Sequence, residues 1–246
     1  MENAQLVALS RQSILRNHLD VIANNMANIN TSGFKSQDMS FVEYIMPFAD
    51  GTAFEPADRE ISYVDMFTTR TNFEPGTINL TENEFDLALN SEGFFVVQMD
   101  DGTEAYTRSG AFQLDATGQL ITSNGRPVLT DAGPITFTRE DGLIEIAADG
   151  TIATELGIRG KIRVVNFDDT RTLEKIGDTM FKGENPLQVA DARIIQGAVE
   201  GSNVSGVSEV TRLIEVTRAY DATSKLVKDL DELRQQAIST LGRIQA

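Results

Sequence analysis

The sequence contains 246 residues, 41% hydrophobic and 24% charged, which is enough apolar material for one large core or two small ones. It has no cysteine, no apolar run near the roughly 20 residues of a membrane span and no signal-like N-terminus, so disulfides, thiolate metal sites, direct membrane insertion and a cleaved signal peptide are not expected. The net charge of −16 lies in the middle of the chain, because residues 36–206 carry 29 acidic and 12 basic side chains, and this argues against a nucleic-acid partner.

Residues 3–29 are predicted to form the first helix. Apolar side chains recur there three or four positions apart, which places them on one face. They are Ala8, Leu15, Leu19, Ile22, Met26 and Ile29. After Met26 the chain becomes rich in Asn, Thr and Ser, which compete with helical hydrogen bonds, and Gly33 suits a left-handed turn. The helix is therefore expected to end before Gly33.

The next segment, residues 34–76, shows neither a helical nor an alternating apolar period. It contains eight aromatic residues and three prolines spread among polar residues. A disordered linker would carry fewer aromatic residues. We therefore expect an irregular, aromatic-rich connecting segment that is held against other surfaces.

Residues 77–200 are predicted to form an all-β domain, barrel-like or sandwich-like. Short apolar runs alternate there with X-Gly pairs, which are the strongest local signal for a hairpin turn. These pairs are Asp101-Gly102, Thr117-Gly118, Asn124-Gly125, Asp141-Gly142 and Asp149-Gly150. The last strand is expected at residues 192–196.

Residues 207–246 are predicted to form a long helix within a C-terminal segment that begins at residue 201. Its apolar positions alternate three and four apart, an average of about 3.5, which is typical of a coiled-coil seam. They are Leu213, Val216, Tyr220, Thr223, Val227, Leu230, Ala237, Leu241 and Ile244, and only Arg234 interrupts them. We expect this helix to complete an α domain with residues 1–33, pairing with the first helix as an antiparallel coiled coil. The predicted fold class is therefore α+β.

Residues that could carry catalysis are few. Asp86, Asp100, Asp101 and Asp115 lie near turns, where aspartate is common for structural reasons. His18 is the only histidine, and a lone histidine in a helix more often packs than binds a metal. Phosphate-binding loops and nucleophile elbows are missing from the sequence. The sequence therefore predicts no enzyme activity, no catalytic, metal or cofactor-binding residues, and no cofactor.

Two stretches at the ends of the chain resemble the signatures of the bacterial flagellar rod and hook proteins. Residues 22–35 fit the approximate pattern A-N-N-hydrophobe-A-N-x-x-T-x-G-F/Y-K/R of that family. Residues 200–204, Glu-Gly-Ser-Asn-Val, and residues 213–222 resemble its C-terminal signature, with Asp221 in place of the usual Glu. Parts of the predicted β domain, such as Tyr106-Thr107-Arg108-Ser109-Gly110, are also similar. The resemblance covers most of the chain and is closest to the proximal rod members.

The resemblance implies a structural subunit of the flagellar basal-body rod, a hollow shaft that crosses the periplasm, transmits motor torque and conducts exported subunits. Its implied partners are copies of itself, the other proximal and distal rod proteins, and the flagellar type III export apparatus. The terminal helices would line the channel and order only on assembly, because isolated helix pairs are marginal in water. The alternatives are a distal rod or other axial subunit, and a self-contained β binding domain or enzyme with a helical stalk.

The residues expected to carry assembly come from both ends of the chain. In the N-terminal part they are Leu15, Leu19, Ile22, Asn24, Asn25, Met26, Ala27, Asn28, Thr31, Gly33 and Phe34. In the C-terminal part they are Gly201, Ser202, Asn203, Val204, Leu213, Ile214, Glu215, Arg218, Ala219, Tyr220, Val227, Leu230 and Leu241. The asparagines between Asn24 and Asn30 are expected to form hydrogen bonds that fix where the chain leaves the first helix.

Overall fold

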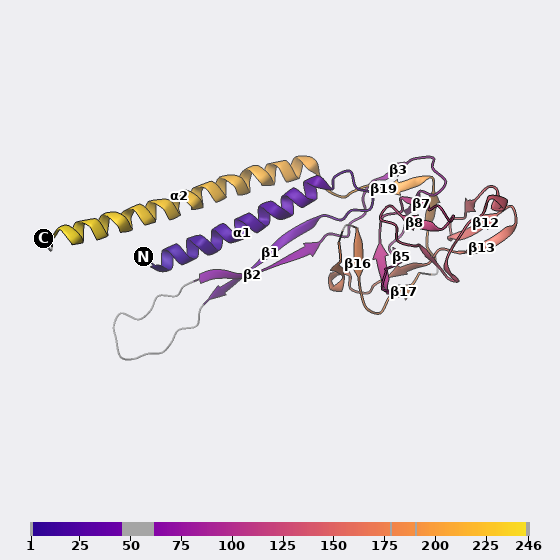
Figure 1. Cartoon of the computed structure of the whole chain (residues 1–246), viewed down its shortest axis with the longest axis horizontal. Coiled ribbons are helices and arrows are strands. Elements are labelled where there is room, and N and C mark those ends of the chain that lie inside the picture. Colours follow the sequence, from indigo (N-terminus) through magenta and orange to yellow (C-terminus); the bar gives the residue numbers. More distant parts are fainter. Residues whose placement is uncertain (1, 46–61, 178, 190, 245–246) are drawn as a thin grey trace. The chain divides into compact units, whose positions relative to one another are not determined.

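The computed structural model describes residues 2–45, 62–177, 179–189 and 191–244. They form two compact units (Figure 1). The helical unit contains two long helices and a two-stranded ladder, and the β unit contains residues 28–36 and 71–204. The described residues thus form an α+β fold, as the sequence predicts. The β unit also includes residues 28–33 and 201–204, which were predicted to belong to the α domain.

The helical unit is built on α1 (Glu2–Ala27) and α2 (Gly206–Ile244). The two helices pack side by side and run in opposite directions (Figure 1). Both lie within two residues of their expected limits. The first helix ends at Ala27 because Asn28 begins a turn, in which the Thr31 N–H donates to the Asn28 carbonyl at 3.2 Å and the Thr31 hydroxyl donates to Asn28 Oδ1 at 3.1 Å.

Strands β1 (Gln37–Ile45) and β2 (Ser62–Thr71) pair with each other in the helical unit. This ladder corrects the expectation of an irregular segment at residues 34–76. The apolar residues of these strands do not alternate, so the sequence period gave no signal, whereas their Thr, Val, Tyr and Phe residues favour strands by propensity. Residues 46–61, which include two of the eight aromatic residues, lie outside the described part of the chain.

The β unit is built from short strands, and all described strand pairs in it are antiparallel. Its largest sheet has the order β15-β16-β6-β5-β14-β17. The other ladders are β3-β19, β4-β18, β7-β8, β9-β10 and β11-β12-β13. The strands are β3 (Ile78–Leu80), β4 (Leu87–Leu89), β5 (Phe94–Gln98), β6 (Glu104–Thr107), β7 (Phe112–Leu114), β8 (Leu120–Thr122), β9 (Leu129–Thr130), β10 (Gly133–Pro134), β11 (Glu145–Ile146), β12 (Thr151–Thr154), β13 (Gly157–Lys161), β14 (Val164–Asn166), β15 (Glu174–Lys175), β16 (Met180–Lys182), β17 (Leu187–Gln188), β18 (Ile194–Gln196) and β19 (Ala198–Glu200), with short 3-10 helices at Arg139–Asp141 and Thr170–Thr172.

The turns between these strands follow the X-Gly pairs of the sequence. Gly102 joins β5 to β6 with φ of 81°, and Gly118 joins β7 to β8 with φ of 82°, a backbone conformation that glycine adopts at little cost. The strand expected at residues 192–196 is β18, but β19 follows it directly and was not predicted. The two strands are separated by Gly197 alone, whose φ is 75°.

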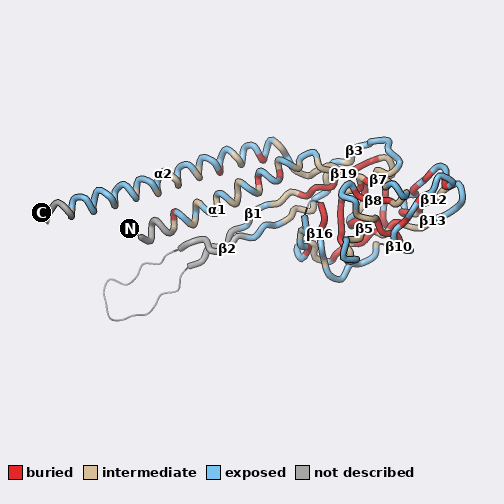
Figure 2. Tube along the Cα trace, in the orientation of Figure 1, coloured by how far each residue is buried: buried red, intermediate tan, exposed pale blue. Residues whose placement is uncertain are grey.

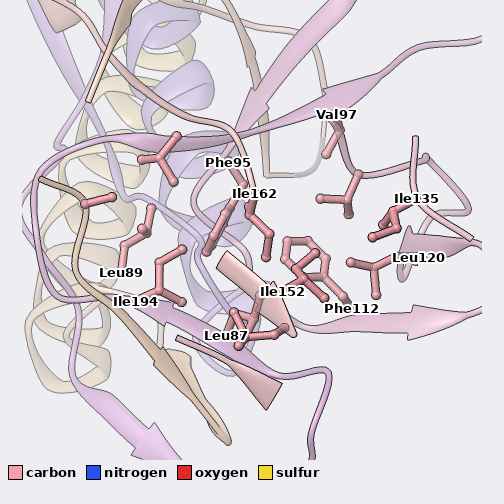
Figure 3. Close-up of a cluster of buried hydrophobic side chains, with 14 of the residues drawn as sticks. Leu87, Leu89, Phe95, Val97, Phe112, Leu120, Ile135, Ile152, Ile162 and Ile194 are labelled. Carbon is pink, nitrogen blue, oxygen red and sulfur yellow. The ribbon is translucent and has the colours of Figure 1, made fainter. Parts of the chain in front are cut away.

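The core of the β unit lies on both faces of strand β5. Phe95 and Val97 pack into one hydrophobic cluster (Figure 3), and Phe94 and Val96 pack into a second one. Successive side chains of a strand point to opposite faces. A strand that is buried on both faces therefore has a continuous apolar sequence, as residues 94–97 of β5 do. Figure 2 shows that buried residues gather in the β unit, whereas the C-terminal half of α2 is mostly exposed.

Candidate assembly site

The helices α1 and α2 pack against each other, and most of the predicted seam residues on them are buried or half-buried. Ala8 and Ile22 of α1 and Val216 and Thr223 of α2 are buried. Other predicted seam residues are half-buried: Leu15, Leu19, Met26, Leu213, Tyr220, Val227 and Leu230. Ala219, beside Tyr220, is half-buried as well. Gln12, the polar member of the α1 stripe, donates from Nε2 to the Tyr220 hydroxyl at 3.2 Å. The seam therefore buries a narrow apolar stripe together with one polar pair.

The helix α2 is longer than the seam that α1 can cover. The Gln12–Tyr220 hydrogen bond fixes the register of the two antiparallel helices, and it places the start of α1 opposite residue 230. Residues 231–244 extend beyond that point (Figure 1), which is about 21 Å of helix. Leu233 is 55% exposed there and Ile238 is 70% exposed. The side chain of Leu241 lies outside the described residues.

Several predicted assembly residues face away from this seam. Ile214, Glu215 and Arg218 of α2 are exposed, and so are Asn24 and Ala27 of α1. The apolar spacing of about 3.5 does not predict the contacts of these residues, because they lie on other faces of the helices. Their side chains are exposed on the surface of the helical unit.

Asn25 connects the last turn of α1 to the start of β1. Its side chain is 1% exposed, donates from Nδ2 to the Gln37 carbonyl at 2.9 Å and accepts from the Gln37 N–H at 3.0 Å. The Asn25 side chain thereby forms hydrogen bonds with both backbone groups of Gln37, as a neighbouring strand would. Of the asparagines expected to fix the exit from the first helix, Asn25 does so within the helical unit and Asn28 shapes the following turn, whereas Asn24 and Asn30 are exposed.

Replacing Asn25 by alanine is expected to destabilise the helical unit by about 2 kcal/mol, because both polar groups of Gln37 lose their partner. Replacing Asn30, an exposed asparagine of the same signature, should cost less than about 0.5 kcal/mol. Urea unfolding followed by helical circular dichroism measures the two effects. Equal losses in the two variants would show that the contact with Gln37 has no stabilising role.

A polar cluster joins α1, β1 and α2 near the start of α2. Arg212 donates from Nη1 to Asp38 at 2.8 Å and to Glu209 at 3.2 Å. Glu209 is buried, and its Oε2 atom has no hydrogen-bond partner among the described residues. Burial and the charge of Arg212 lower the pKa of His18, against the opposing effect of Glu209 and Asp38. His18 is therefore neutral at pH 7 and acts as a packed side chain.

The lowered pKa of His18 makes the helical unit sensitive to mild acid. Below pH 6.5 the unfolded chain binds a proton at this histidine more readily than the folded chain does, so stability falls as the pH drops from 7 to 5. We expect His18→Gln to reduce this loss. Thermal melts of the two proteins at pH 7 and pH 5, followed by helical circular dichroism, test it. An unchanged pH dependence in the variant would contradict the assignment.

The ends of the two signatures meet inside the β unit. The Gly33 N–H donates to the Glu200 carbonyl at 2.7 Å. Asn203 accepts from the Ser36 N–H at 2.7 Å, and its Nδ2 donates to the carbonyls of Asn72 and Glu74 at 2.9 and 3.0 Å. Residues 33–36, 72–74 and 200–203 are thus tied together, largely through backbone groups. Gly201, Ser202 and Val204, which are expected to carry assembly, lie in this extended connection before α2.

A buried ion network lies at the centre of this meeting point. Glu200 is 1% exposed and contacts Lys35 Nζ through Oε1 and Arg108 Nε through Oε2, both at 2.6 Å. The Gly76 N–H also donates to Oε1, at 2.9 Å. The remaining donors turn to backbone carbonyls: Lys35 Nζ reaches Glu74 at 2.7 Å, and the Arg108 guanidinium reaches Gly93, Ser91 and Leu89. The network joins the N-terminal signature, the β6 end and the C-terminal signature.

The electrostatics of this network favour an ionised Glu200. Burial raises the pKa of the Glu200 carboxyl, but the charge of Arg108 and the hydrogen bonds from Lys35 and Gly76 outweigh burial and hold it below its ordinary value. Burial lowers the pKa of Lys35 more than Glu200 raises it. The sequence resemblance included Lys35, Arg108 and Glu200 but assigned no role to them. The available signal was a charged residue within each motif.

Phe34 and Gly33 complete the packing beside the ion network. Phe34 is buried, and Lys175 Nζ lies 4.2 Å from the centre of its ring, a cation–π contact. Gly33 has φ of 68°, and a Cβ atom built on it would lie 2.2 Å from the Ser109 backbone nitrogen. Only glycine fits at position 33, because the backbone of the β6–β7 connection occupies the space of a side chain.

The aspartates weighed as catalytic candidates have structural contacts. Asp101 Oδ1 accepts from the Thr103 N–H at 2.9 Å, and Asp115 Oδ1 accepts from the Thr117 and Gln119 N–H groups at 2.8 Å, so both close turns. Asp86 accepts from the Thr81 hydroxyl, and Asp100 pairs with Arg126. Within the described part of the chain there is no group of three or more His, Asp or Glu residues placed to hold a metal ion. Neither described helix combines the length and the apolar character that crossing a membrane requires.

Comparison with known proteins identifies the two signatures and part of the β unit. Residues 6–35 match the family described as flagella basal body rod protein. Residues 88–158 match the flagellar hook protein FlgE/F/G D1 domain, and residues 195–240 match the flagellar basal body rod FlgEFG protein C-terminal region. The first and third ranges cover most of α1 and α2 and include Lys35 and Glu200 of the ion network, and the second range includes Arg108.

Named relatives align along the whole chain. The flagellar basal-body rod protein FlgF of Caulobacter vibrioides is 39% identical over 99% of this chain and 100% of its own length. FlgF of Mesorhizobium japonicum is 33% identical over 98% of this chain and 99% of its own length. The rod protein FlgG of Agrobacterium fabrum is 31% identical over 94% of this chain and 96% of its own length. The chain therefore belongs to the flagellar basal-body rod protein family.

Proposed function

We propose that this chain is a structural subunit of the flagellar basal-body rod, most similar to FlgF, and that it assembles through its terminal helices. The observation that carries the proposal is the length of α2 beyond α1, with exposed Leu233 and Ile238 on it. A helix that exposes apolar side chains in an isolated subunit gains burial when further helices pack on it. The full-length similarity to FlgF and FlgG rod proteins supports the same function.

The proposed assembly uses different surfaces of each subunit in each contact. Contacts between unlike surfaces that do not close into a ring build a helical filament, which is the geometry of a rod. In this proposal α1 and α2 pair as an antiparallel coiled coil, supported by their spacing of about 3.5 and by the Gln12–Tyr220 register. The β unit forms a sandwich-like outer domain, supported by the burial of β5 on both faces. Interdigitated side chains resist sliding, as torque transmission requires.

The proposed partners are copies of this chain, the other proximal and distal rod proteins, and the flagellar type III export apparatus. The proposed location is the basal body, where the rod crosses the periplasm, and delivery uses no cleaved signal. The role needs neither catalysis nor a cofactor. The greater similarity to FlgF relatives favours the proximal rod, and the FlgG relatives make the distal rod the alternative.

Purified basal bodies test this function. We expect the chain in the rod fraction, and we expect deletion of its gene to stop rod assembly and motility. Rods isolated from cells that lack the distal rod protein should still contain it if its place is proximal. Basal bodies that are complete without the chain would contradict the proposal. The chain in distal rod segments alone would select the alternative.

A further inference from the structure

The β unit contains an open groove beside the buried ion network, and no function has been given to it above. Its volume is about 900 Å³. Its apolar wall carries Phe73, Phe94 and Phe167, with Phe94 5.6 Å from Phe73 and 5.9 Å from Phe167 between ring centres. Three exposed carboxylates, Glu74, Glu92 and Asp168, also line it. We refer to this feature as the acidic groove.

The charge of the acidic groove is negative where a ligand would enter. Lys35 and Arg108 also line it, but both are buried and direct their donors to Glu200 and to backbone carbonyls. Glu92 and Asp168 form no ion pair within the described residues. Aromatic rings beside free carboxylates suit a partner that carries an arginine or lysine next to an aliphatic side chain.

The helical unit presents such a combination on the face of α2 opposite the seam. Val207 is 82% exposed, Val210 43% and Ile214 48%. Arg218 is exposed one turn after Ile214 and forms no ion pair in the described structure. Their spacing of three and four residues places these side chains on one face. We refer to Val207, Val210, Ile214 and Arg218 as the outer patch.

We propose that the outer patch of one copy docks in the acidic groove of a second copy. Ile214 packs against the phenylalanine rings, and Arg218 pairs with Glu92 and Asp168. This inference rests on the proposed function, because it assumes a polymer, and it names one contact within that polymer. In a pair of copies joined in this way, one copy still has a free outer patch and the other still has a free acidic groove. Further copies can therefore add at both ends of the pair.

Cysteine cross-linking in rods tests the contact without background, because the chain has no native cysteine. A chain with Glu92→Cys and Ile214→Cys is expected to give a ladder of disulfide-linked dimers and larger species. The control pairs Ile214→Cys with Glu184→Cys, an exposed acidic residue outside the groove, and should stay monomeric. A monomer with an internal disulfide would show that the patch fills its own groove and would overturn the inference.

A charge exchange keeps the test decisive if the cysteine variants fail to assemble. Arg218→Asp and Asp168→Arg should each reduce incorporation into rods about tenfold, and the two changes in one chain should restore it. The exposed pair Glu184→Gln and Asp191→Asn serves as the neutral control. Normal incorporation of both single variants, without cross-links, would overturn the contact but leave the rod function intact. Absence of the wild-type chain from rods would instead contradict the proposed function.

Discussion

Replacing Glu200 by glutamine is expected to lower the free energy of unfolding of the β unit by about 3–5 kcal/mol. The carboxylate accepts from Lys35, Arg108 and the Gly76 N–H, and it is 1% exposed. Glutamine keeps the shape but removes the only negative charge of the network. Lys35 and Arg108 would then be two buried cations without a counter-charge.

Urea unfolding of the full-length protein, followed by the circular dichroism of the β strands, measures this loss. Glu184→Gln is the matched control, because Glu184 is exposed, and it should change stability by less than about 0.5 kcal/mol. A loss below about 1 kcal/mol for Glu200→Gln would mean that the network does not hold the two signatures together.

The same variant should change the response to acid. The pKa of Glu200 is lowered in the folded chain, so its contribution is complete above the ordinary glutamate value of 4.5 and is lost as the pH falls through the folded value. Hydrogen bonds from neighbouring threonine residues also lower the pKa values of Asp101, Asp115 and Asp149. These carboxylates therefore also stabilise the folded chain at neutral pH and lose that contribution in acid. The stability difference between wild type and Glu200→Gln should therefore narrow at low pH.

Replacing Gly33 by alanine is expected to prevent the β unit from closing normally, with a loss of more than about 3 kcal/mol. The φ of 68° alone costs a non-glycine residue about 1–2 kcal/mol. In addition, the new Cβ atom would lie 2.2 Å from the Ser109 nitrogen, which is backbone and cannot rotate away. The hydrogen bond from Gly33 to the Glu200 carbonyl would be lost when the segments separate.

Gly102→Ala separates the two causes. Gly102 has φ of 81°, but a Cβ atom there meets nothing within 4 Å, so this variant pays only the conformational cost. Calorimetric melts of both variants measure the difference between them. If Gly33→Ala were no less stable than Gly102→Ala, the close approach to Ser109 would not constrain the fold.

Helices and hairpin turns could be predicted because their signals are local. The apolar spacing of α2 and the glycines of the X-Gly turns act through neighbouring residues, and both were found where expected. The β1–β2 ladder was missed because its apolar residues do not alternate. Strand β19 was missed because Gly197 is a one-residue break between two strands, which reads as the start of a loop.

The candidate site could be predicted only in part, because its two halves have different physical origins. The seam residues follow a period, and those from Ala8 to Met26 and from Leu213 to Leu230 are buried or half-buried. Ile29 is the exception, because it lies in the turn after α1 and is exposed. The network of Lys35, Arg108 and Glu200 joins residues far apart in sequence, and no local pattern shows which charges will meet. The resemblance marked these positions as part of motifs, but their role follows from burial and distance.

Hydrogen exchange, measured peptide by peptide on the isolated chain and on assembled rods, tests the central claim most directly. In the isolated chain the account predicts slow exchange in β5 and β6, faster exchange in the helical unit, and the fastest exchange at residues 231–240, which α1 does not cover. In rods, residues 231–240 should become protected. Exchange at these residues that is as slow in the isolated chain as in β5 and β6 would show that α2 needs no neighbour, and it would contradict assembly through the terminal helices.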